Sequence, residues 1–211
     1  MTGIEVIFAL IIFLFSVIIH EVAHGSVANQ LGDPTAKYAG RLTLNPIPHI
    51  DPVGSILVPF LLFLAHSPII FGWAKPVPIN PFNFRDKKFG ELRVALAGAT
   101  ANLILALIFG LIMRFMPGYV GPLGSAIYVM FQWVVFINLA LAVFNLVPIP
   151  PLDGSHVLFA LLPSSQAEFK LFMQKWGLVI FLFFLLFITP FLYPLIQFLY
   201  QLIVGAPLLL I

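Results

Sequence analysis

The chain has 211 residues, of which 61% are hydrophobic and only 9% are charged, and its formal net charge is +2. This length suits one domain, and the composition places that domain in a membrane, while the small net charge gives no sign of nucleic-acid binding. The sequence contains no cysteine, which excludes disulfides and thiolate metal ligands. We expect a single domain over residues 1–211, with a core at about 4–160 and a helical tail at about 174–205.

The first predicted helix covers residues 4–30 and carries the motif His20-Glu21-x-x-His24. Two histidines four residues apart share one face of a helix and can bind the same metal ion. A neighbouring carboxylate can take a proton from a metal-bound water, which is the arrangement of a zinc hydrolase. The helix is apolar enough to lie in a membrane, where Glu21 needs a compensating partner such as a bound cation.

Residues 36–44 alternate roughly between polar and apolar side chains and are interrupted by Gly40. This pattern predicts a short membrane-associated β-hairpin. A strand edge beside the metal helix could pair with an extended peptide. The residues predicted to pair with a substrate strand are Gly40, Arg41, Leu42 and Thr43.

Further apolar segments follow, separated by a polar loop at residues 72–91. Residues 53–73 are apolar but contain Pro59 and Pro68, which favours a re-entrant or interfacial segment. Membrane helices are predicted at 93–116 and 125–147, and the apolar tail at 174–205 predicts one or two C-terminal helices. The expected fold is a mainly α polytopic membrane protein with three core transmembrane helices, at 4–30, 93–116 and 125–147.

Two histidines leave a zinc site short of a third protein ligand. Asp153 is the best candidate, because it follows a proline-rich stretch that unwinds the chain after a membrane helix. Asp51 together with His49 is a rival, since both follow soon after the first helix. If Asp153 joins the two histidines, almost all the basic residues share one side of the membrane, and the positive-inside rule makes that side the cytoplasm.

The paired motifs His20-Glu21-x-x-His24 and Asn145…Pro148…Asp153-Gly154 resemble the site-2 protease family of intramembrane zinc metalloproteases. Residues 98–102, Gly-Ala-Thr-Ala-Asn, resemble that family's small-residue motif. The resemblance covers residues 4–160, and the chain has no room for a PDZ or CBS domain. It implies an integral membrane protein, in the cell membrane if the source is prokaryotic.

The resemblance also implies the roles of individual residues. One Zn²⁺ per chain would be bound by His20, His24 and Asp153, with Glu21 as general base and then acid. Asn145 and Asn102 would steady the substrate or its oxyanion. The implied partners are a transmembrane protein or peptide substrate and the lipid bilayer, with no nucleic acid; substrate identity and oligomeric state stay open.

Two other classes of function are alternatives to the protease. A metal-ion transporter could use the same His, Glu and Asp cluster as a transit site, but more ionisable residues along its spans are expected than this chain has. A non-catalytic membrane scaffold would be favoured by the loss of the motif glutamate, yet Glu21 is present.

Overall fold

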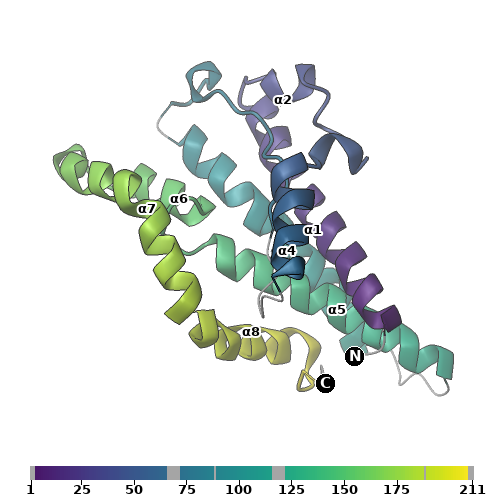
Figure 1. Ribbon diagram of the computed structural model, residues 1–211. Coiled ribbons are helices and arrows are strands. Elements are labelled where there is room, and N and C mark those ends of the chain that lie inside the picture. The colour runs from purple at the N-terminus through teal and green to yellow at the C-terminus, as the bar shows by residue number, and fades with distance from the viewer. Residues whose placement is uncertain (1–2, 66–71, 88, 116–121, 188, 209–211) are drawn as a thin grey trace.

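The computed structural model describes residues 3–65, 72–87, 89–115, 122–187 and 189–208 (Figure 1). Four of its helices contain segments long and apolar enough to cross a membrane. They are α1 (Gly3–Gln30), α4 (Gly90–Phe115), α5 (Pro122–Asn145) and α7 (Ala167–Phe187). The shorter elements are α2 (Thr35–Tyr38), η1 (Ile47–His49), η2 (Pro52–Leu57), α3 (Val58–Leu64), η3 (Pro81–Asn83), α6 (Asp153–Leu161), η4 (Ser164–Gln166) and α8 (Thr189–Val204).

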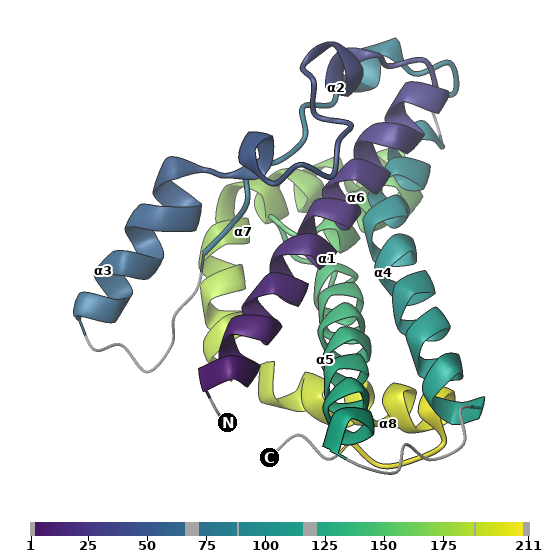
Figure 2. The ribbon, with the colours of Figure 1, turned by 90° about the vertical axis from the view of Figure 1, so that its right-hand side faces the viewer.

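Helices α1, α4 and α5 pack against one another, as Figure 2 shows. The packing surface of α4 is made of small residues spaced three or four apart, which lie on one side of a helix. Small side chains let helix backbones approach closely within a membrane, where apolar burial alone gives little driving force. The buried small residues of α4 include Ala95, Gly98, Ala99, Ala106 and Gly110.

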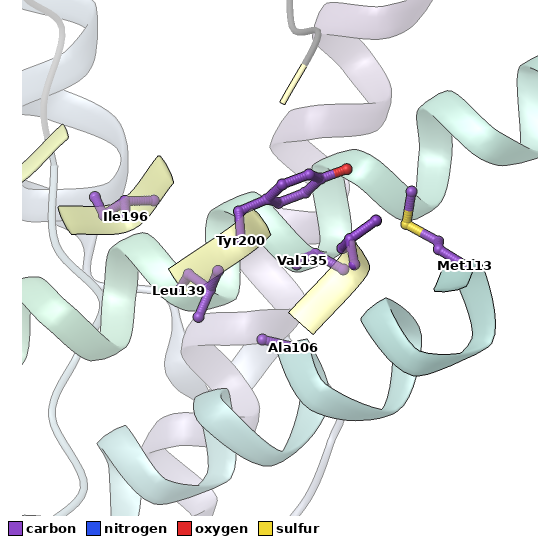
Figure 3. Packing of buried hydrophobic residues seen from close by; sticks show 7 residues of the cluster. Ala106, Met113, Val135, Leu139, Ile196 and Tyr200 are labelled. Carbon is purple, nitrogen blue, oxygen red and sulfur yellow. The ribbon is translucent and has the colours of Figure 1, made fainter. Parts of the chain in front are cut away.

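A hydrophobic cluster stabilises the end of the bundle at which α4 finishes (Figure 3). It joins Ala106 and Met113 of α4 to Val135 and Leu139 of α5, and α8 closes it with three residues that include Tyr200. Helix α8 therefore lies across the end of the bundle where α4 finishes, away from α2 and α6 (Figure 2).

The predicted β-hairpin at 36–44 is wrong, because none of the residues that the structure describes lies in a β-strand. The short helix α2 occupies the start of this stretch, and Gly40 follows it with a φ of 66°. Asp33 accepts hydrogen bonds from the backbone and hydroxyl of Thr35 and so stabilises the first turn of α2. These local hydrogen bonds outweigh the weak alternation of polar and apolar residues.

The prediction of three core transmembrane helices is also corrected, since the described residues contain four candidate spans. The fourth, α7, begins at Ala167, whereas the sequence pattern placed the start of a tail at residue 174. Charged residues near its first turns, Glu168, Lys170 and Lys175, mask the beginning of the helix in the sequence.

The predicted re-entrant or interfacial segment at 53–73 is described in part, because residues 66–71 lie outside the described residues. Its described part forms η2 and the seven-residue helix α3, which stands apart from α1 (Figure 2). A transmembrane helix needs about 20 residues, so this described part alone is too short to cross the membrane.

The carboxylate of Asp33 joins the end of α1 to the loop before α4. Its Oδ2 accepts the backbone N–H of Asn80 at 2.7 Å, and its Oδ1 accepts the side-chain amide of Asn83 at 2.8 Å. Burial alone would raise the pKa of Asp33, but the hydrogen bonds from Thr35, Asn80 and Asn83 outweigh it and hold the pKa below its usual range.

An Asp33→Asn variant is expected to be less stable than the wild type at pH 7, by about 1.5–3 kcal/mol, because charge-assisted hydrogen bonds are lost. A lowered folded-state pKa adds stability above the ordinary aspartate pKa of about 3.9, and this stability is lost as the pH falls through the folded-state value. Thermal unfolding in detergent between pH 7 and pH 3 measures the effect. A stability gap that does not narrow below about pH 4 contradicts it.

Candidate metal centre

His20 and His24 lie one turn apart on α1 and converge on Asp153 at the start of α6. The Nε2 atoms of the two imidazoles are 3.0 Å apart. Asp153 Oδ2 lies 2.9 Å from His20 Nε2 and 3.1 Å from His24 Nε2. One ligand atom from each residue therefore points to a single position between α1 and α6.

Asp153 reaches this position because the chain folds back sharply after α5. That helix ends at Asn145, and three prolines between residues 148 and 151 prevent its continuation. The backbone of Gly154 then packs on the end of α5: a Cβ there would lie 2.3 Å from the carbonyl oxygen of Leu146. A glycine after Asp153 is needed for this close approach, which turns the carboxylate toward α1.

The second nitrogen of each imidazole is occupied by a group that can only accept a hydrogen bond. His24 Nδ1 lies 2.7 Å from the backbone oxygen of Val94, and His20 Nδ1 lies 2.6 Å from Oδ1 of Asn102. Each Nδ1 must therefore carry the proton. In the neutral imidazoles both Nε2 atoms then present a lone pair to the shared position.

Two nitrogen lone pairs and a carboxylate oxygen about 3 Å apart repel one another unless a proton or a metal cation lies between them. A tetrahedral zinc site with bonds of about 2.0–2.1 Å places its ligand atoms about 3.3 Å apart, close to the spacing found here. His20, His24 and Asp153 thus fit a zinc ion with three protein ligands, the number that catalytic zinc sites use.

Glu21 lies beside this cluster, and its carboxylate is held by a segment from the polar loop. Its Oε2 accepts the backbone N–H of Val77 at 2.8 Å. The 74–80 segment that carries Val77 is itself fixed on both sides. The Arg41 guanidinium donates to the carbonyl oxygens of Lys75 and Pro76, and the Lys75 N–H donates to the carbonyl of His49.

A cavity of about 500 Å³ opens onto the same place. Its walls come from α1, the 74–80 segment, α4, α6 and α7. Residues that line it include Glu21, His24, Val77, Glu91, Asp153 and Lys170. The cavity gives a water molecule and a peptide room to reach both the metal position and the Glu21 carboxylate.

The two amides predicted to contact the substrate are not among the residues that line the cavity. Asn102 is fully buried behind His20, and Asn145 donates its side-chain amide to Leu141 of its own helix. The rival pair is not assembled either: Asp51 caps the start of η2, and the ring of His49 contacts the carbonyl of Thr43.

The candidates for substrate-strand pairing form no strand in the described structure, and their contact with a substrate stays a prediction. They are Gly40, Arg41, Leu42 and Thr43. Of these, Arg41 is buried with its guanidinium on the 74–80 segment.

Sequence reasoning missed three contributors to the centre. Val77 acts through its backbone, which leaves no signal in the sequence. Ser16 and Asn138 are buried beside Asn102, and a signal for Asn138 was present: an amide in the middle of an apolar membrane helix is costly unless it is hydrogen-bonded.

Comparison with known proteins gives one family and several relatives. Residues 122–188 match Peptidase family M50. YwhC of Bacillus subtilis is 37% identical, over 87% of this chain and 81% of YwhC. Rip2 of Mycolicibacterium smegmatis is 31% identical, over 87% of this chain and 68% of Rip2. MJ0611 of Methanocaldococcus jannaschii is 29% identical, over 80% of this chain and 85% of MJ0611. The names of all three describe zinc metalloproteases, and no solved structure matches.

Proposed function

Because the chain belongs to peptidase family M50, the site-2 protease family, and is a zinc metalloprotease, we propose that it cleaves its substrates inside the membrane. The bond hydrolysed lies in or near a transmembrane segment of a membrane protein. The observation that carries this proposal is the position of the ligand cluster. His20 and His24 belong to a candidate membrane span, and they pack against Gly98 of another.

In this proposal His20, His24 and Asp153 bind the zinc ion. When bound, zinc supplies a Lewis acid that makes water more acidic and polarises a peptide carbonyl. Glu21 is the general base: it takes a proton from the attacking water and returns it to the leaving amine. The hydrogen bond from Val77 keeps the Glu21 carboxylate on the wall of the cavity, where that water enters.

The active site faces the cytoplasm in this proposal. Basic residues gather in the described loops and helix ends near the place where α1 finishes and α4 begins, whereas Arg114 lies in the last turn of α4. An excess of lysine and arginine marks cytoplasmic loops. The basic residues at the site end include Lys37, Arg41, Lys75, Arg85, Lys87, Arg93 and Lys170.

The test uses purified protein in liposomes with a tagged transmembrane substrate, together with measurement of bound zinc and mapping of the cut by mass spectrometry. We expect wild-type protein to cut within or beside the transmembrane segment. Asp153→Asn is expected to lose zinc and cleavage together, because a neutral amide is a poor replacement for a charged ligand.

Asp51→Asn is the matched control, since it makes the same change at the rival acid, and it should keep both zinc and activity. Wild-type protein that binds zinc, cuts nothing and moves the ion across the liposome membrane would overturn the proposal in favour of a transporter.

A further inference from the structure

Buried polar side chains link α5, α4 and α1 behind the metal cluster. We infer that Asn138, Asn102 and Ser16 form a positioning network that sets the orientation and the protonated nitrogen of His20, so that its Nε2 faces the zinc ion. The inference rests on the proposed role of His20 as a zinc ligand.

The network starts at a backbone carbonyl of α5. The side-chain amide of Asn138 donates to the backbone oxygen of Val134 at 2.9 Å and to Oγ of Ser16 at 2.9 Å. A carbonyl oxygen can only accept, so the nitrogen of the Asn138 amide must point toward Val134. The Oδ1 atom of Asn138 is thereby directed toward α4.

Asn102 is the next residue in the network, and its amide nitrogen is again the donor. Its amide nitrogen donates to Oδ1 of Asn138 at 2.8 Å and to the backbone oxygen of Ser16 at 3.2 Å. Both partners are acceptors, which leaves Oδ1 of Asn102 as the atom that faces His20. Since an amide oxygen cannot donate, the 2.6 Å contact requires the proton to be on Nδ1 of His20.

Because the network is buried, the reversed orientation of either amide is energetically unfavourable. The exposed fractions of Asn102, Asn138 and Ser16 are 0%, 1% and 3%. Turning either amide over would place nitrogen against nitrogen or oxygen against oxygen among buried groups, where such a mismatch is costly. One tautomer of His20 is therefore strongly favoured before any metal binds.

The two histidine ligands differ in what orients them. His24 donates to a backbone carbonyl of α4, which no substitution of a side chain removes directly. His20 depends on side chains from α4 and α5. Changes in the network should therefore affect His20 alone, and this makes the inference testable at one residue.

The experiment compares wild type, Asn102→Leu and Asn138→Leu, with Gln132→Leu as matched control. Gln132 is a buried amide on α5 that belongs to a different part of the bundle. Leucine nearly preserves the volume of each side chain. The readouts are the zinc dissociation constant, by competition with a chelator, and the histidine tautomers, by nitrogen-15 NMR of the five labelled histidines.

We expect Asn102→Leu to weaken zinc binding about 100-fold and Asn138→Leu about 10-fold, the range found when groups behind a metal ligand are removed. The smaller loss reflects the remaining bond from Asn102 to Ser16. In Asn102→Leu the Nδ1 proton of His20 should lose its hydrogen-bonded downfield shift, and in Asn138→Leu this shift should be reduced, while the Nδ1 proton of His24 keeps its own in both variants. Gln132→Leu should match wild type in both readouts. If Asn102→Leu does not fold, Asn138→Leu carries the test.

Zinc binding within about twofold of wild type in both variants would overturn the inference. A loss of zinc affinity in Gln132→Leu as large as in the two network variants would also overturn it, because it would indicate general loosening of the bundle. A His20→Ala variant separates these results from the proposed function. If His20→Ala binds zinc as tightly as wild type, the ligand assignment itself is wrong.

Discussion

A Glu21→Gln variant is expected to keep its zinc and to cut substrate about 10²–10⁴-fold more slowly, the usual loss when a general base is removed. Glutamine has the same size, and its side-chain oxygen can still accept the Val77 N–H. The amide cannot take up a proton, so the attacking water is no longer activated. Zinc content and single-turnover cleavage of a tagged transmembrane substrate measure the two properties separately.

Glu91→Gln is the matched control, because Glu91 lines the same cavity from the first turn of α4. It should keep most of the activity. If Glu91→Gln loses as much activity as Glu21→Gln, the effect belongs to the charge of the cavity, and Glu21 is not the base.

Replacing Gly98 by alanine should weaken zinc binding by more than about 100-fold, the upper end of the loss caused by changes behind a ligand. A Cβ at this position would lie 2.4 Å from Nε2 of His24 and 2.5 Å from Nε2 of His20. Neither imidazole can move away easily, since Val94 and Asn102 hold their Nδ1 atoms. The added methyl group would thus displace the ligand atoms themselves, and cleavage would be lost with the metal.

Gly110→Ala provides the control, because it makes the same change on the same helix away from the metal cluster. A Cβ there would lie 2.4 Å from the Cγ2 methyl group of Ile203 in α8. It should reduce thermal stability and leave zinc content unchanged. If zinc binding survives in Gly98→Ala, the close packing of the histidines on α4 is not required for the site.

The family and the zinc enzyme could be predicted from the sequence because their signals are local. His20, Glu21 and His24 need only the periodicity of one helix to come together. The candidate Asp153 required one more step, the recognition that prolines after a membrane helix free an acid to turn inward. In the structure Asp153 lies beside the two histidines, whereas the rival Asp51 caps the start of η2.

The remainder depended on interactions between distant segments. The alternation at 36–44 resembled a strand, but Asp33, which lies before that stretch, favours a helical turn. Asn102 was expected at the substrate, and its burial behind His20 follows from how α4 packs on α1 and α5. The contact of Val77 with Glu21 uses a backbone N–H, which every residue except proline has, so no residue type could reveal it.

Helix α7 touches the loop that delivers Asp153. A Cβ on Gly177 would lie 2.5 Å from the ring of Pro150, and Lys170 and Gln174 form part of the cavity wall. The smallest working fragment of this protein should therefore include α7 as well as the metal ligands. A shorter piece would retain every metal ligand and still lack the surface against which one of them is set.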